Sequence, residues 1–151
     1  MKINQFMKRN VISIPSKTTI SEAAAVIVKK HVGTLPVLDN QGKPIGVIRL
    51  EDLLTLEMPD FIHLISNINF IHDFGAVETT RPAHRLLEKD VTTIMQPVIT
   101  IQEDTGLLHA YAIMLQNNIY DMPVTTETGE LVGIVSRADI GSAILATWSA
   151  E

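Results

Sequence analysis

The chain contains one stretch twice: residues 11–54 read VISIPSKTTISEAAAVIVKKHVGTLPVLDNQGKPIGVIRLEDLL, and residues 98–141 read VITIQEDTGLLHAYAIMLQNNIYDMPVTTETGELVGIVSRADIG. A constant shift of 87 positions aligns the two copies without a gap. The shift places Pro36 on Pro123, Gly46 on Gly133 and Asp52 on Asp139. A repeat of this length indicates duplicated supersecondary units that bury their apolar faces on one another. We therefore look for a functional site where the two copies meet.

Each copy predicts a β-α-β-β-α unit. In the first copy, residues 11–14 are an apolar run typical of a strand, and Thr19 with Glu22 forms a capping box before an alanine-rich helix over residues 23–30. Strands are expected at residues 35–38 and 45–48, and a helix at residues 51–56. The second copy predicts helices at residues 107–116 and 138–147 and strands at residues 122–125 and 131–135. Gly46 and Gly133 precede buried strand ends, where a close backbone approach is expected.

Three segments divide the chain: a first repeat at residues 1–54, a connecting insertion at 55–93 and a second repeat at 94–151. The insertion predicts a helix that starts at residues 58–60 and a short helix over 83–89. Phe61, Phe70 and Phe74, three of the four phenylalanines, lie in it. These residues fit either a cap on the core or subunit contact, or a ligand lid or partner surface.

Composition excludes several functions. The 151 residues are 46% hydrophobic and carry a net charge of −5, which argues against binding to nucleic acid because that needs a basic face. The apolar runs are too short to span a membrane, and no signal peptide is evident, so we expect a cytoplasmic protein. The sequence has no cysteine, which excludes disulfides and thiolate chemistry.

No pattern in the sequence indicates catalysis. A nucleophile elbow, a phosphate-binding glycine loop and a triad order are all missing. His63, His72, Asp73 and His84 match no metal-ligand spacing, so we predict neither a metal site nor a required cofactor. The protein is not expected to be an enzyme.

Three features recur in the two copies or close them: Leu35-Pro36-Val37 with Met122-Pro123-Val124, the glycine pairs 42/46 and 129/133, and the run GIVSRAD at residues 133–139. With these features the two copies together resemble a tandem pair of CBS domains, the Bateman module. The resemblance implies an α/β (α+β) fold of two repeats related by pseudo-two-fold symmetry. It also implies a stand-alone regulatory, energy-sensing module that binds AMP, ADP, ATP or S-adenosylmethionine between the repeats, and that forms a homodimer.

Ser136 and Asp139 are the strongest candidates for ligand contact. Ser136 stands where a strand gives way to a helix, so its hydroxyl and the following N–H groups could hold an anion, and the Asp139 carboxylate could accept hydrogen bonds from ribose hydroxyls. The same spacing also fits an ordinary helix start, with a hydroxyl cap and an acid in the first turn. The first copy keeps the acid as Asp52 but has Arg49 in place of the serine, so capping alone does not account for the acid, and Arg49 is expected to pair with Asp52 or to reach phosphate.

By resemblance, the ligand-binding residues form two slots. The first would contain Ser136, Asp139, Arg137, Ile12, Val32, Gly33 and Thr34. The second would contain Arg49, Asp52, Ile99, Ile119, Tyr120 and Asp121. Asp121 would repel a polyphosphate, so a nucleoside, a monophosphate or a sulfonium compound is as credible a ligand as ATP.

Two hypotheses follow. The first is a sensor whose adenosine ligand shifts the relation between repeats or subunits and thereby signals to a protein partner. The second is a structural homodimer with no physiological nucleotide, which uses the insertion as its partner surface.

Overall fold

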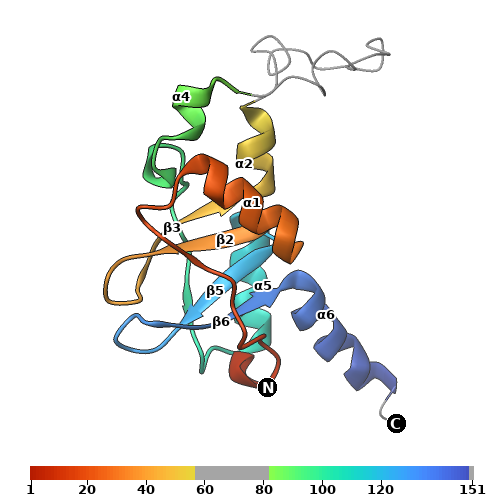
Figure 1. Ribbon diagram of the computed structural model, residues 1–151. Helices are drawn as coiled ribbons and strands as arrows, with labels where there is room; N and C mark the ends of the chain where they lie inside the picture. Colours follow the sequence, from red (N-terminus) through yellow and green to blue (C-terminus); the bar gives the residue numbers. More distant parts are fainter. Residues whose placement is uncertain (57–81, 150–151) are drawn as a thin grey trace, which may run out of the picture.

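The two copies build two three-stranded sheets, one from each repeat (Figure 1). The computed structural model describes residues 1–56 and 82–149. The first repeat consists of β1 (Ile14–Pro15), α1 (Ile20–Lys30), β2 (Thr34–Leu38), β3 (Pro44–Arg49) and α2 (Leu50–Thr55). The second consists of β4 (Ile101–Gln102), α5 (Leu107–Gln116), β5 (Asp121–Thr125), β6 (Leu131–Ser136) and α6 (Arg137–Ala146). The other described elements are α4 (His84–Leu87) and the 3-10 helices η1 (Ile3–Gln5), η3 (Val91–Thr93) and η4 (Thr147–Ser149).

The predicted β-α-β-β-α order is confirmed in both repeats. Helix α1 begins directly after Thr19, whose Oγ1 accepts a hydrogen bond from the Glu22 N–H at 3.1 Å. The strand predicted at residues 11–14 is wrong except at its last residue, because Val11 and Ile12 line a cleft and do not join the sheet. Within the insertion, the short helix expected at residues 83–89 is α4; the helix expected from residue 58 and the three phenylalanines lie outside the described residues.

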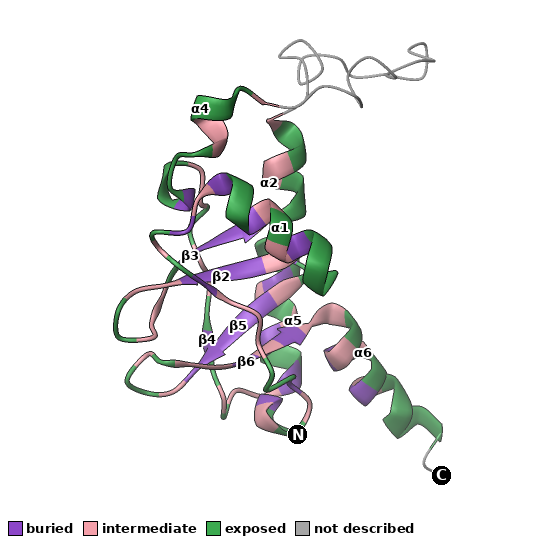
Figure 2. Cartoon of the chain, in the orientation of Figure 1, coloured by how far each residue is buried: buried purple, intermediate pink, exposed green. Residues whose placement is uncertain are grey.

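The sheets have the same pairing in both repeats. Strand β1 pairs in parallel with β2, and β4 pairs in parallel with β5. The β2–β3 and β5–β6 hairpins are antiparallel, with Pro36 opposite Val47 and Pro123 opposite Ile134. Gly42 and Gly129 lie in the turns of the two hairpins and have φ of 78° and 93°. Residues with a side chain rarely adopt such positive φ values. Figure 2 shows the central strands buried and the outward faces of the helices exposed. The duplication in sequence is therefore a duplication of topology.

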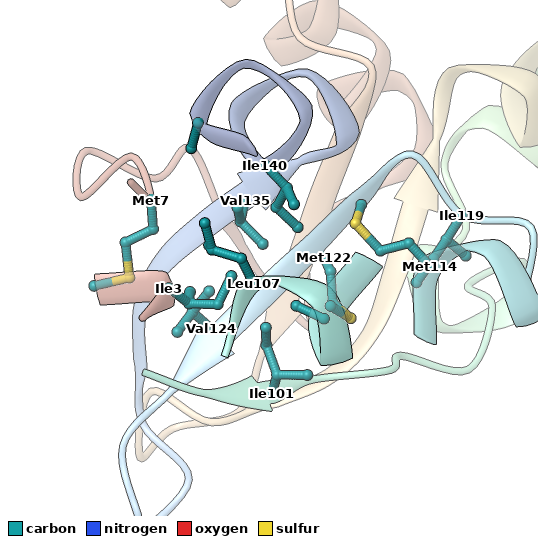
Figure 3. Packing of buried hydrophobic residues seen from close by; sticks show 12 residues of the cluster. Ile3, Met7, Ile101, Leu107, Met114, Ile119, Met122, Val124, Val135 and Ile140 are labelled. Atoms are coloured by element: carbon teal, nitrogen blue, oxygen red, sulfur yellow. The ribbon is translucent and has the colours of Figure 1, made fainter. Parts of the chain in front are cut away.

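Each core is completed by the segment that precedes the other repeat. Ile3 and Met7, at the start of the chain, are buried in the core of the second repeat, where Figure 3 shows them beside Leu107 and Val124. Val91, which precedes the second repeat, is buried in the core of the first. The lead-in segments are thus exchanged between the repeats, and neither repeat has a complete core of its own.

Backbone hydrogen bonds secure this exchange. Lys8 and Ile134 exchange both N–H···O bonds at 2.9 Å, and Gln96 pairs with Val47 at 2.9 and 3.0 Å in the same way. A Cβ added at Gly133 would lie 2.5 Å from the Met7 Sδ. Added at Gly46, it would lie 2.6 Å from the sulfur of Met95, which precedes Gln96 as Met7 precedes Lys8. The close approach predicted at both glycines is confirmed, and the exchanged segments are the reason for it.

Candidate functional site

The repeats meet at Thr34 and Asp121, the first residues of β2 and β5. These positions are equivalent under the repeat shift, and the Thr34 Oγ1 donates a hydrogen bond to the Asp121 Oδ2 at 3.3 Å across the seam. Central strands β2 and β5 lie in the middle of the molecule in Figure 1. A contact between equivalent residues is what a pseudo-two-fold axis produces, so this pair marks the axis.

Two clefts flank the pair. The Lys8 cleft has a volume of about 260 Å³ and is lined by Lys8, Asn10, Val11, Ile12, His31, Val32, Gly33, Thr34, Asp121 and Ile134. The Arg49 cleft has a volume of about 270 Å³ and is lined by Gly33, Thr34, Arg49, Leu50, Glu51, Asn118, Ile119, Tyr120 and Asp121. Each cleft draws residues from both repeats, as expected for sites between them.

Four residues of the first predicted slot lie together in the Lys8 cleft: Ile12, Val32, Gly33 and Thr34. Ser136 and Asp139 are not in its wall, because they form a complete capping box at the start of α6. The Ser136 Oγ accepts from the Asp139 N–H at 3.0 Å, and the Asp139 Oδ2 accepts from the Ser136 N–H at 2.9 Å. The capping interpretation of this pair is therefore realised in the structure.

Asp139 still reaches the edge of the Lys8 cleft. Its Oδ1 lies 3.4 Å from the Lys8 Nζ, and Lys8 is part of the cleft wall. The Asp139 side chain is 19% exposed, whereas that of Lys8 is 66% exposed. The exposed lysine can move away, so the carboxylate can exchange this ion pair for another donor at little cost.

Four residues of the second predicted slot lie together in the Arg49 cleft: Arg49, Ile119, Tyr120 and Asp121. Asp52 does not line it, because its Oδ2 accepts from the Arg49 N–H at 2.8 Å. The inference that capping cannot account for Asp52 is therefore wrong: an acid at the third helical position caps the backbone whatever side chain stands before the helix. Ile99 is also outside the wall and packs against the second core.

Arg137 is not directed toward a cleft. Its Nε donates to the Ile119 carbonyl at 2.7 Å and its Nη2 to the Met114 carbonyl at 3.3 Å, so the guanidinium caps the end of α5. The same group lies over the Tyr120 ring, 4.3 Å from its centre. Its role in the structure is to hold the turn before β5.

In the described part of the chain, Asp121 is the one titratable group that lines both clefts. Burial raises the pKa of its carboxyl above the usual 3.8; the Thr34 hydroxyl and the charge of Lys8 oppose that rise, and Asp139 adds to it. A carboxylate in this position is desolvated without being fully paired. It would favour a ligand that brings a hydrogen-bond donor or a positive charge.

Sequence reasoning missed several lining residues, among them His31 and Asn118. These occupy equivalent positions after α1 and α5 and both have left-handed backbone, with φ of 56° and 52°. Asparagine tolerates this conformation, and helices often end in a left-handed residue. The position of both residues just after a predicted helix was therefore the signal that could have indicated their role. Together they turn the chain so that the next three residues enter a cleft.

Other features lie apart from the seam. A larger cavity of about 480 Å³ lies between the start of α1 and α4, beside Thr19, Glu22 and His84. Within residues 1–56 and 82–149, no three histidine or acidic side chains gather as a metal site would require; His63, His72 and Asp73 lie outside these ranges. No described helix combines the length and apolarity needed to cross a membrane.

The chain belongs to the CBS-domain family, because the model of that domain matches residues 3–58 and again residues 89–146. Among similar proteins is the chloroplastic CBS domain-containing protein CBSX1 of Arabidopsis thaliana, 28% identical over 95% of this chain, which spans 64% of the length of CBSX1.

Two solved structures share the fold. One is CBSX2 in complex with AMP, at 26% identity and a TM-score of 0.72, covering 97% of this chain and 98% of that one. The other is the CBS domain pair of protein MJ0100 in complex with 5′-methylthioadenosine and S-adenosylmethionine, at 24% identity and a TM-score of 0.69 with the same coverage. The predicted tandem CBS pair is thereby confirmed.

Proposed function

We propose that this chain is a regulatory module that binds an adenosine-containing ligand, of the group AMP, ADP, ATP and S-adenosylmethionine, between its CBS repeats. The observation that carries the proposal is the pair of clefts on the seam, each lined by both repeats and flanked by a helix start with an acid in its first turn. The AMP complex of the similar protein CBSX2 supports this ligand class.

The Lys8 cleft has the chemistry that a nucleoside needs. Ile12 and Val32 offer apolar walls for a flat base, and the backbone at Gly33 is open because no side chain covers it. In this proposal the Asp139 Oδ1 exchanges its ion pair with Lys8 for hydrogen bonds from ribose hydroxyls, and the exposure of the lysine supports that exchange. Ser136 and Arg137 support this site indirectly, the first through the cap and the second through the turn.

A thermal-shift titration with adenosine, AMP, ATP and S-adenosylmethionine tests the proposal, since a ligand that binds only the folded chain raises its midpoint. We expect a rise in the native protein, its loss in Asp139→Ala, and its retention in Asp104→Ala, which changes an acid on a distant turn. Each variant is compared with its own ligand-free midpoint because Asp139→Ala also removes part of a helix cap. A chain that responds to none of the four compounds would contradict the proposal.

Signalling to a protein partner and assembly as a homodimer complete the proposal. Exposed apolar side chains on the helices support association, with Val28 79% exposed on α1, Leu108 72% on α5, and Trp148 74% on η4. An apolar groove of about 300 Å³ runs between α1, α2 and α4. Sedimentation analysis is expected to give twice the monomer mass. The cytoplasmic location stays a prediction.

A further inference from the structure

We propose that Asp121 is a specificity-determining residue for both clefts, so that the chain accepts adenosine compounds with at most one phosphate and rejects polyphosphates. This inference rests on the proposed function and narrows its ligand class.

The position of Asp121 makes one side chain act on two sites. Among residues 1–56 and 82–149, only Gly33, Thr34 and Asp121 are common to both clefts, and the Asp121 carboxylate is held between them by the Thr34 hydroxyl at 3.3 Å. In the first repeat the equivalent position is Thr34 itself, which carries no charge. A single acid on the axis therefore brings negative charge to both clefts, whereas a symmetric pair of neutral residues would bring none.

The charges around the clefts do not compensate for this acid. In the Lys8 cleft a single lysine serves two carboxylates, since it pairs with Asp139 at 3.4 Å and its charge also acts on Asp121. In the Arg49 cleft one arginine stands against two acids, Glu51 and Asp121. Among the described residues, the wall of the Arg49 cleft thus has one arginine and two carboxylates, and the lysine of the Lys8 cleft has two carboxylates near it. Neither wall offers the excess of lysine and arginine that a polyphosphate needs.

The size of the clefts points the same way. Their volumes of about 260 and 270 Å³ lie below the range of roughly 300–1,000 Å³ that is typical of small-molecule sites. That space suits a nucleoside better than a nucleotide with an extended phosphate chain. The raised pKa of Asp121 agrees, because a desolvated carboxylate with a single side-chain donor in the described part of the chain is stabilised by a donor or a cation and destabilised by an anion.

Isothermal titration of the full chain with adenosine, AMP, ATP and S-adenosylmethionine tests the inference. The proteins are the native chain, Asp121→Asn, and Asp104→Asn, which removes the same charge at an exposed site away from the clefts. We expect the native chain to bind adenosine and S-adenosylmethionine at least as tightly as AMP, and ATP at least about tenfold more weakly than AMP. Asp121→Asn is expected to raise the affinity for ATP relative to the affinity for adenosine by about tenfold, whereas Asp104→Asn is expected to leave that ratio of affinities unchanged.

The outcomes separate the two proposals. If the native chain binds ATP as tightly as adenosine, or if the two asparagine variants shift the ratio equally, the specificity inference is overturned and the proposed function stands. If none of the four compounds binds any of the three proteins, the proposed function fails and takes the inference with it. A circular dichroism melt of each variant confirms that it is folded, and the carboxamide keeps an acceptor for the Thr34 hydroxyl.

Discussion

At the residue scale, the most consequential divergence between the two copies is at the pair Thr34 and Asp121. The shared backbone brings the equivalent positions together, and the side chains then differ in charge. Burial of the acid costs free energy that a neutral residue would not cost. The asymmetry therefore has a price in stability, which can be measured without any ligand.

We expect Asp121→Asn to be more stable than the native chain at neutral pH. Because burial raises the pKa of Asp121 above 3.8, the folded state binds its proton more tightly than the unfolded state. The contribution of this group to the free energy of unfolding is thus fully present below pH 3.8 and declines as the pH rises through the raised pKa. Urea unfolding at several pH values should show the gap between the two proteins opening over that window. A constant gap at all pH values would contradict this assignment.

At the element scale, the same helix start occurs twice with different caps. Helices α2 and α6 both have an acid at the third position that accepts from the backbone N–H of the capping residue, at 2.8 and 2.9 Å. Only α6 also has a side-chain cap, because Ser136 can accept a hydrogen bond and Arg49 cannot. The two capping residues have nearly the same backbone conformation, with φ and ψ of −102° and 164° at Ser136 and −109° and 152° at Arg49.

Removing the side-chain cap of α6 and introducing one at α2 should therefore change the free energy of unfolding in opposite directions. Ser136→Ala is expected to lower the free energy of unfolding by about 1 kcal/mol, because it leaves the Asp139 N–H without its partner. Arg49→Ser is expected to raise it by about 0.5–1 kcal/mol, because the backbone is already set for a serine cap. Denaturant midpoints measure both. A loss of stability in Arg49→Ser would mean that the arginine side chain has a structural role that outweighs the missing cap.

At the scale of the whole molecule, the exchange of lead-in segments couples the two repeats. Ile3 is fully buried in the second core although it precedes the first repeat, and Val91 is fully buried in the first core although it precedes the second. The Ile3 N–H donates to the Thr105 carbonyl at 2.8 Å, and the Val91 N–H donates to the Thr18 carbonyl at the same distance. The clefts therefore lie between two repeats, each of which depends on a segment that precedes the other.

Ile3→Ala should consequently destabilise the distant repeat first. Removing this buried side chain is expected to cost about 2–4 kcal/mol. Native-state hydrogen exchange should show β5 and β6 losing protection at least as early as β2 and β3, although the latter are nearer in sequence. Val91→Ala is the matched variant and should show the reverse preference. If both variants weakened only the repeat that follows them in sequence, the exchanged arrangement would be refuted.

Much of the fold could be predicted from particular residues. Glycines at equivalent positions marked the hairpin turns, and Thr19 with Glu22 marked a helix start, because these residues act through local backbone geometry. The grouping of Ile12 with Val32 and of Ile119 with Tyr120 followed from the family resemblance. The placement of Ile99 and Arg137 could not be predicted in this way. Whether a side chain packs into a core or caps a helix end depends on which neighbours are within reach.

The amino-acid sequence by itself determined the duplication, the order of elements and the CBS pair, because periodicity, turns and caps are local properties that repeat with the residues. Only the tertiary structure decided that each lead-in completes the opposite core, that Asp52 and Asp139 are drawn back onto their helix starts, and that Asp121 stands between both clefts. The physical reason is that these facts concern contacts between the two copies, and an internal repeat says that such contacts exist without saying which side chains make them.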